Sequence, residues 1–133
     1  MLGLFGPKSD KTGAYRAAFV YQVPFKKDFS TASRAINKVV FGKWRKDKEL
    51  ANTVFGSFST LPAANGTGTI ATRTPYSFAS GVLLKSNMPA TIAETVFITN
   101  DKEGQLLSNG TGARQQEIAE ALRVGIDDYL TTH

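Results

Sequence analysis

The sequence predicts an α/β domain in which a mixed, largely parallel sheet is flanked by helices. Short segments rich in β-branched and aromatic residues recur along the chain, and stretches with the 3.6-residue period of a helix separate them. The apolar fraction of 41% is enough to build a core. A length of 133 residues favours one domain that spans the whole chain, 1–133.

The first elements are a lead-in and a strand. Residues 1–14 contain three glycines and a proline, which predicts a loose lead-in. Residues 15–23, YRAAFVYQV, have the aromatic and β-branched composition of a strand. Pro24 and the charged residues 26–28 are expected to end it.

Two helical patterns follow. Ser30 or Thr31 can cap the first helix, and Gly42 is expected to interrupt it. The second pattern places its apolar residues on one face and a charged run, residues 46–49 (KDKE), on the opposite face. The apolar positions are Ala32, Ala35, Ile36, Val39 and Val40 in the first helix, and Trp44, Leu50, Ala51, Val54, Phe55 and Phe58 in the second.

In the second half of the chain, the spacing of the apolar residues changes from a helical to a strand-like period. Residues 67–73, 78–85 and 91–99 predict short strands, and TIAETVFIT at 91–99 is the strongest strand pattern in the chain. A loop over 100–112 and a closing helix over 113–131 complete the prediction. The tetrapeptide NGTG occurs at 65–68 and again at 109–112, and we interpret both copies as tight turns.

Composition excludes several classes of site. The chain has no cysteine, and its one histidine is His133 at the C-terminus. A disulfide framework, a thiolate zinc site and a self-contained Ser-His-Asp triad are therefore excluded. We expect neither a secretory signal peptide nor a membrane span, because no apolar run approaches the necessary length.

A net charge of +5 suits an anionic partner. The basic run 43–48 (KWRKDK) contains an aromatic residue, as nucleic-acid surfaces do. Asp47 and Glu49 interrupt this positive charge, so we predict no specific nucleic-acid binding.

Glu94 is the residue that most suggests chemistry. No carboxylate occurs in the 44 residues between Glu49 and Glu94, and Glu94 then shares a predicted strand face with Ile92 and Val96. A carboxylate on an apolar face is costly unless it is paired, bound to a metal or used as an acid or base. The structural alternative is that Glu94 faces solvent or pairs with Arg73 or Lys85.

An ordered set of motifs fills residues 80–131. It comprises Val82-Leu83, Met88-Pro89-Ala90, Glu94 followed by Phe97, Thr99 and Asn100, then Glu103, Leu106-Leu107, Gln116-Glu117-Ile118-Ala119, Gly125-Ile126 and Tyr129-Leu130. This order closely resembles the C-terminal part of the zinc-dependent N-acetylmuramoyl-L-alanine amidases. The resemblance is weaker over 47–79.

The resemblance implies an amidase-like fold that is incomplete at its N-terminal side. It implies that Glu94 is the catalytic general base or proton shuttle beside a zinc ion. The substrate would be peptidoglycan or a muropeptide, cut between N-acetylmuramic acid and L-alanine. The location would be the periplasm or cell wall, or a phage lysin.

Two departures from the family pattern limit this prediction. The family binds zinc through two histidines and a glutamate upstream of the matched segment, whereas this chain has no histidine before His133. Val96 also stands where the family has glycine. We therefore assign no metal ligand, expect no zinc bound by this chain alone, and predict inactivity without a missing N-terminal half. The alternative is a non-catalytic binding or interaction domain of amidase descent. An incomplete sheet would expose an unpaired edge, so we also expect self-association or a partner that covers this edge.

Overall fold

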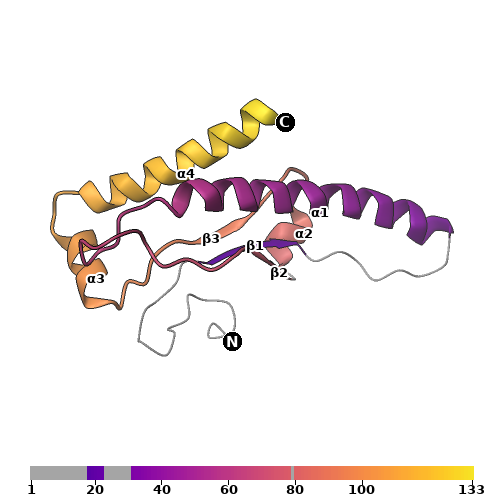
Figure 1. Cartoon of the computed structure of the whole chain (residues 1–133). Helices are drawn as coiled ribbons and strands as arrows, with labels where there is room; N and C mark the ends of the chain where they lie inside the picture. Colours follow the sequence, from indigo (N-terminus) through magenta and orange to yellow (C-terminus); the bar gives the residue numbers. More distant parts are fainter. Residues whose placement is uncertain (1–17, 23–30, 79) are drawn as a thin grey trace.

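The computed structural model describes residues 18–22, 31–78 and 80–133, and this part of the chain is mostly helical (Figure 1). Four helices dominate it, and three strands of five, three and three residues accompany them. The elements in chain order are β1 (Ala18–Gln22), α1 (Thr31–Phe58), β2 (Tyr76–Phe78), α2 (Gly81–Lys85), β3 (Ile92–Glu94), α3 (Asp101–Ser108) and α4 (Ala113–Thr132). The predicted α/β fold with a largely parallel sheet is therefore wrong.

The strands pair in the order β2-β1-β3. β1 runs parallel to β2 and antiparallel to β3, so only one of the two pairings is parallel. Val20 lies opposite Tyr76 on one side and opposite Ile92 on the other. Figure 1 shows α1 lying between this small sheet and α4.

The strand prediction failed because the apolar, β-branched segments either form a short helix or pack against α1. The pattern at 91–99 forms a strand only over Ile92–Glu94, and beyond it Val96 packs against the buried cluster of Val54, Phe58 and Leu61. Residues 78–85 contribute the end of β2 and then the short helix α2. The predicted strand 67–73 is not a continuous strand, and it contributes single bridge residues at Thr69, which pairs with Pro62, and at Thr72.

α1 runs for 28 residues straight through Gly42, so the predicted interruption is also wrong. A glycine inside a helix costs about 1 kcal/mol, which packing of a long apolar stripe readily offsets. Ala51, Val54 and Phe58 from that stripe are buried. The cap candidate Ser30, the lead-in 1–14 and the flanks of the strand predicted at 15–23 lie outside the described residues.

The closing helix is confirmed, since α4 covers the predicted range 113–131 and ends one residue later. It crosses α1 so closely that a Cβ atom at Gly125 would lie 2.6 Å from the Cα of Val54. The Ser57 hydroxyl on α1 donates a 2.8 Å hydrogen bond to the Ala121 carbonyl on α4. This crossing joins the two longest helices and forms the core.

The two NGTG turns are confirmed and share one geometry. The side-chain oxygen of Asn65 accepts from the Thr67 amide at 3.0 Å, and Asn109 accepts from Thr111 at 3.0 Å. All four glycines have φ between 70° and 78°, a region that favours glycine.

The loop predicted over 100–112 is wrong over Asp101–Ser108, which form α3 with Asn100 as its N-cap.

Candidate functional site

Glu94 is the last residue of β3, and one of its two carboxyl oxygens lies in an unusual environment. Its Oε2 atom is buried and has no hydrogen-bond partner within the described part of the chain. Burial raises the pKa of the Glu94 carboxyl above its ordinary value, because desolvation disfavours the charged form. Neither Arg73 nor Lys85 forms an ion pair with it among the described residues, so the predicted structural pairing is not observed.

Tyr76 on β2 lies on the same face of the sheet as Glu94. Val20 pairs with both Tyr76 and Ile92, and Glu94 is two residues beyond Ile92 on a strand whose faces alternate. Burial raises the pKa of the Tyr76 hydroxyl, Arg73 opposes that shift, and the charge of Glu94 adds to it. Tyr76 is therefore electrostatically coupled to both charged groups.

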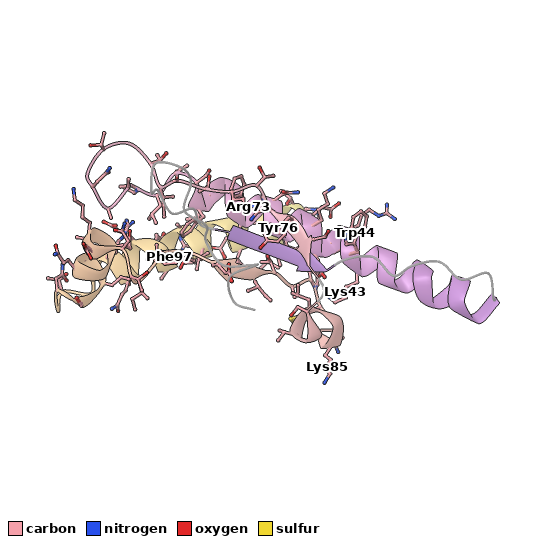
Figure 2. The ribbon with its side chains drawn as sticks, turned by 90° about the horizontal axis from the view of Figure 1, so that it is seen from below. Lys43, Trp44, Arg73, Tyr76, Lys85 and Phe97 are labelled. Atoms are coloured by element: carbon pink, nitrogen blue, oxygen red, sulfur yellow. The ribbon has the colours of Figure 1, made fainter. Side chains whose placement is uncertain are left out.

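Arg73 packs over the Tyr76 ring, with its guanidinium carbon 4.5 Å from the ring centroid. Figure 2 shows the two side chains together beside β1. This is a cation–π contact, which fixes the plane of the guanidinium without occupying its N–H donors. The site thus comprises the Arg73 guanidinium just before β2, the Tyr76 phenol on β2 and the Glu94 carboxyl on β3.

Asp47 on α1 anchors the segment that leads into β3. It is fully buried, and its Oδ1 accepts a 2.9 Å hydrogen bond from the Ala90 amide. Lys43, one helical turn earlier, pairs with it at 2.7 Å. The prediction of a charged outer face at 46–49 is therefore wrong for Asp47. The Lys43–Asp47 spacing of four residues was the only sequence signal of this pair.

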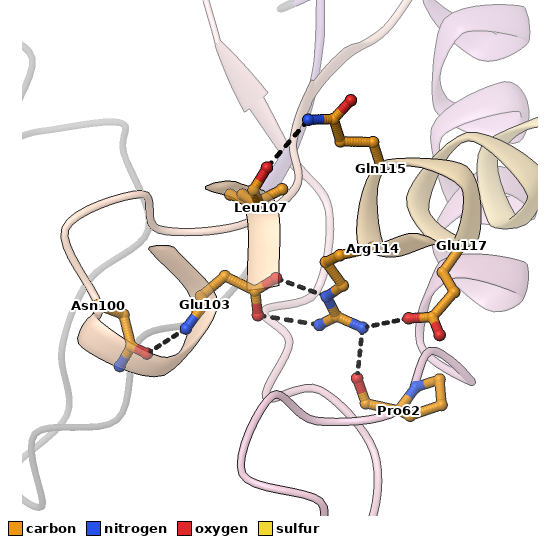
Figure 3. Close-up of polar contacts among 7 residues, drawn as sticks. All are labelled: Pro62, Asn100, Glu103, Leu107, Arg114, Gln115 and Glu117. Carbon is orange, nitrogen blue, oxygen red and sulfur yellow. Dashed lines mark hydrogen bonds and ion pairs between the residues drawn. The ribbon is translucent and has the colours of Figure 1, made fainter. Parts of the chain in front are cut away.

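Asn100 and Glu103, two residues of the amidase-like motif, have structural partners. Asn100 accepts from the Glu103 amide at 3.1 Å and caps α3. The buried Glu103 carboxylate receives two hydrogen bonds from Arg114, from Nε at 2.5 Å and from Nη2 at 2.9 Å (Figure 3). Nη1 of Arg114 contacts the Pro62 carbonyl and Glu117, each at 2.9 Å. No pattern in the sequence predicted the role of Arg114.

The described residues do not by themselves fit a zinc centre. Nowhere in ranges 18–22, 31–78 and 80–133 do three histidine, cysteine, aspartate or glutamate residues gather as metal ligands could. His133 stacks on Tyr129 with ring centroids 4.3 Å apart, and its Nε2 lies 3.2 Å from Glu49. The implied zinc would need ligands from elsewhere.

An apolar cleft of about 290 Å³ lies between α1, α4 and the approach to β3. It is lined by Leu50, Val54, Pro89, Ala90, Thr91, Ala93, Leu122 and Ile126.

In the basic run 43–48, the Lys48 ammonium lies 5.6 Å from the centre of the Trp44 ring. None of the helices in the described ranges combines the length and apolarity needed to cross a bilayer.

Comparison of the chain with protein-family models, with curated proteins and with solved structures finds no match in any of the three.

Proposed function

We propose that this chain is the C-terminal portion of an N-acetylmuramoyl-L-alanine amidase, in which Glu94 acts as the proton-transfer group. The proposal is supported first by the order of motifs over 80–131. The structural observation that carries it is the buried Oε2 of Glu94, which has no hydrogen-bond partner among the residues that the structure describes. Buried polar atoms nearly always have partners, and a catalytic role is one of the explanations for an exception.

The surroundings of Glu94 are suited to general acid–base catalysis. A raised pKa brings the carboxyl closer to neutral pH, where it can take a proton from an attacking water and return it to the leaving amine. The bond from the Ala90 amide to Asp47 fixes the chain four residues before Glu94. Because His133 is the only histidine in the sequence, the two histidine ligands of the family's zinc site would come from polypeptide outside this chain.

The experiment compares this chain with a polypeptide extended by the upstream reading frame. For the chain alone we expect no amidase turnover and less than about 0.1 equivalent of zinc, because a three-ligand site cannot be assembled from it. The extended polypeptide should contain two histidines and a glutamate as ligands, and should release L-alanyl peptides from muropeptides.

Glu94→Gln in the extended polypeptide tests the role of the carboxyl. We expect turnover to fall by about 10²- to 10⁴-fold, the usual contribution of a general acid–base group. Glu120→Gln is the matched control, since Glu120 is exposed on α4 and should leave turnover unchanged. Full activity in Glu94→Gln, or zinc-dependent turnover by the chain alone, would contradict the proposal.

The alternative is a non-catalytic interaction domain of amidase descent. Large apolar side chains exposed near the strands favour it, with Val82 71% and Met88 66% exposed. An upstream frame without histidine ligands, together with stable capture of peptidoglycan by the chain, would select this alternative.

A further inference from the structure

We propose that the outer face of α4 binds a second copy of this chain, so that two α4 helices pair antiparallel in a symmetric dimer. The α4 surface, as we call it, consists of Leu122, Ile126 and Leu130 with the flanking residues Arg123 and Asp127. It lies on a helix and not at a sheet edge, where the sequence suggested self-association. The inference does not depend on the proposed function.

An apolar stripe runs along the outer face of α4. Leu122, Ile126 and Leu130 follow one another at intervals of four residues, which places them on one side of the helix. Ile126 is 45% exposed and Leu130 is 67% exposed. Figure 1 shows α4 along the outer edge of the molecule, with α1 on its inner side. Two large apolar side chains on neighbouring turns are therefore left in contact with solvent, as at interaction surfaces.

The apolar cleft of about 290 Å³ begins at the same stripe. Leu122 and Ile126 form its wall on α4, and Leu50 and Val54 form its wall on α1. The residues that line the cleft are apolar apart from one threonine, so it suits an aliphatic side chain and excludes a charged one.

A second copy can supply that side chain. When two α4 helices pair antiparallel about a two-fold axis at Ile126, the two copies of Ile126 meet. Leu130 of each copy then lies opposite the partner's Leu122, because both residues are four positions from the axis. Leu122 lines the cleft, so each Leu130 reaches the partner's cleft. The same surface serves both copies, as a closed two-fold dimer requires.

The charges beside the stripe select the antiparallel arrangement. Arg123 and Asp127 lie one turn apart on the same side of the stripe, and both are exposed. In the antiparallel pair the residue opposite Arg123 is the partner's residue 129, so the partner's Asp127 lies about 3 Å away along the helix axis. A parallel pair in register would instead bring Arg123 against Arg123 and Asp127 against Asp127. The antiparallel dimer therefore has complementary charges on its rim.

The size of the surface predicts weak association. One pair of helix faces buries less than the roughly 800 Å² per partner of a standard interface. We therefore expect a dissociation constant of about 10–100 µM, so that the chain is monomeric at a few micromolar.

Sedimentation equilibrium of the chain, from about 5 to 500 µM, tests the proposal. Leu130→Glu should raise the dissociation constant by about thirtyfold or more, because it would place a charge in the partner's apolar cleft. Val82→Glu is the matched control, since Val82 is 71% exposed on α2 and lies outside the α4 surface. This variant should dimerise like wild type. Circular dichroism checks that both variants remain folded.

Two charge variants test the register. Arg123→Asp places two acids on the rim and Asp127→Arg places two bases there, so each variant alone should stay monomeric through repulsion between copies. An equimolar mixture should recover the dimer, with one copy of each variant, because opposite charges then meet. Loss of the ion pair within α4 would not predict this recovery, because that pair stays broken in both variants.

A wild-type chain that is monomeric up to about 500 µM would overturn the inference. So would equal weakening by Leu130→Glu and Val82→Glu, or charge variants that stay monomeric when mixed. None of these results bears on the turnover of Glu94→Gln in the extended polypeptide, so the two proposals can fail separately.

Discussion

Two carboxylates of the same motif have opposite environments. Glu103, on the helical side of the molecule, is buried and receives two hydrogen bonds from Arg114. Glu94, on the strand side, has a buried oxygen with no partner among the described residues. A buried charge with hydrogen-bond partners is compatible with a stable fold, whereas a buried polar atom without them costs stability. The motif therefore mixes structural and candidate functional residues.

Packing differs less sharply than electrostatics between the two sides. On the helical side, α1 and α4 approach so closely at Gly125 that a methyl group would not fit. Large apolar side chains are nevertheless exposed on both sides, since Val82, Met88 and Ile98 near the strands and Leu130 on α4 are each at least 66% exposed. The close helix crossing, and not the amount of exposed apolar surface, distinguishes the helical side.

The largest expected effect is on the helical side, from Arg114→Ala. This change leaves the Glu103 carboxylate buried without its cation, and we expect the free energy of unfolding to fall by about 3 kcal/mol. Chemical denaturation measures it. Arg123→Ala is the control, because its ion pairs with Glu120 and Asp127 are exposed and its denaturation midpoint should match that of wild type. Equal midpoints for both variants would contradict the contrast between a buried and an exposed pair.

Gly125→Ala tests the close helix crossing. The new Cβ would lie 2.6 Å from the Val54 Cα, so the two helices must separate, and we expect a loss of about 1–3 kcal/mol. Gly56→Ala on α1 is the matched control, since a Cβ there meets no atom within 4 Å. That variant should gain about 0.5–1 kcal/mol from helix propensity. If both substitutions stabilise the protein, the described crossing is wrong.

The smallest effect is the pH dependence due to Glu94. Because its pKa is raised in the folded state, the folded chain keeps a proton that the unfolded chain releases above about pH 4.5. Stability should therefore fall as pH rises from 4.5 through the raised pKa, and then stay constant. Glu94→Gln should remove this decline and be slightly more stable than wild type at pH 7.

Glu120 provides a control of opposite sign. The hydrogen bond from Arg123 lowers the pKa of the Glu120 carboxyl, so its contribution is present at neutral pH and is lost on acidification. Thermal unfolding of wild type, Glu94→Gln and Glu120→Gln between pH 4 and 8 compares the two directions. A decline above pH 4.5 that persists in Glu94→Gln would show that Glu94 is not its source.

Local patterns predicted the elements that depend on local forces. The closing helix followed from a 3.6-residue stripe over 113–131, and the two NGTG turns followed from glycine and asparagine chemistry. The strands at 78–85 and 91–99 were overpredicted, because β-branched composition does not tell whether a segment finds a strand partner or packs against a helix. The continuity of α1 through Gly42 was likewise missed, because one glycine in a helix interior costs only about 1 kcal/mol.

The sequence by itself determined the long closing helix, the paired turns, the absence of a cysteine or multi-histidine metal site, and the isolation of Glu94 in a stretch without other acids. Only the tertiary structure decided that the fold is mostly helical, that Asp47 and Arg114 are buried partners, and that Arg73 lies on the Tyr76 ring. The physical reason is the sequence distance over which the stabilising interactions act. Turns and helix stripes arise from neighbours within about four residues, whereas strand pairing and charge burial depend on contacts between distant segments.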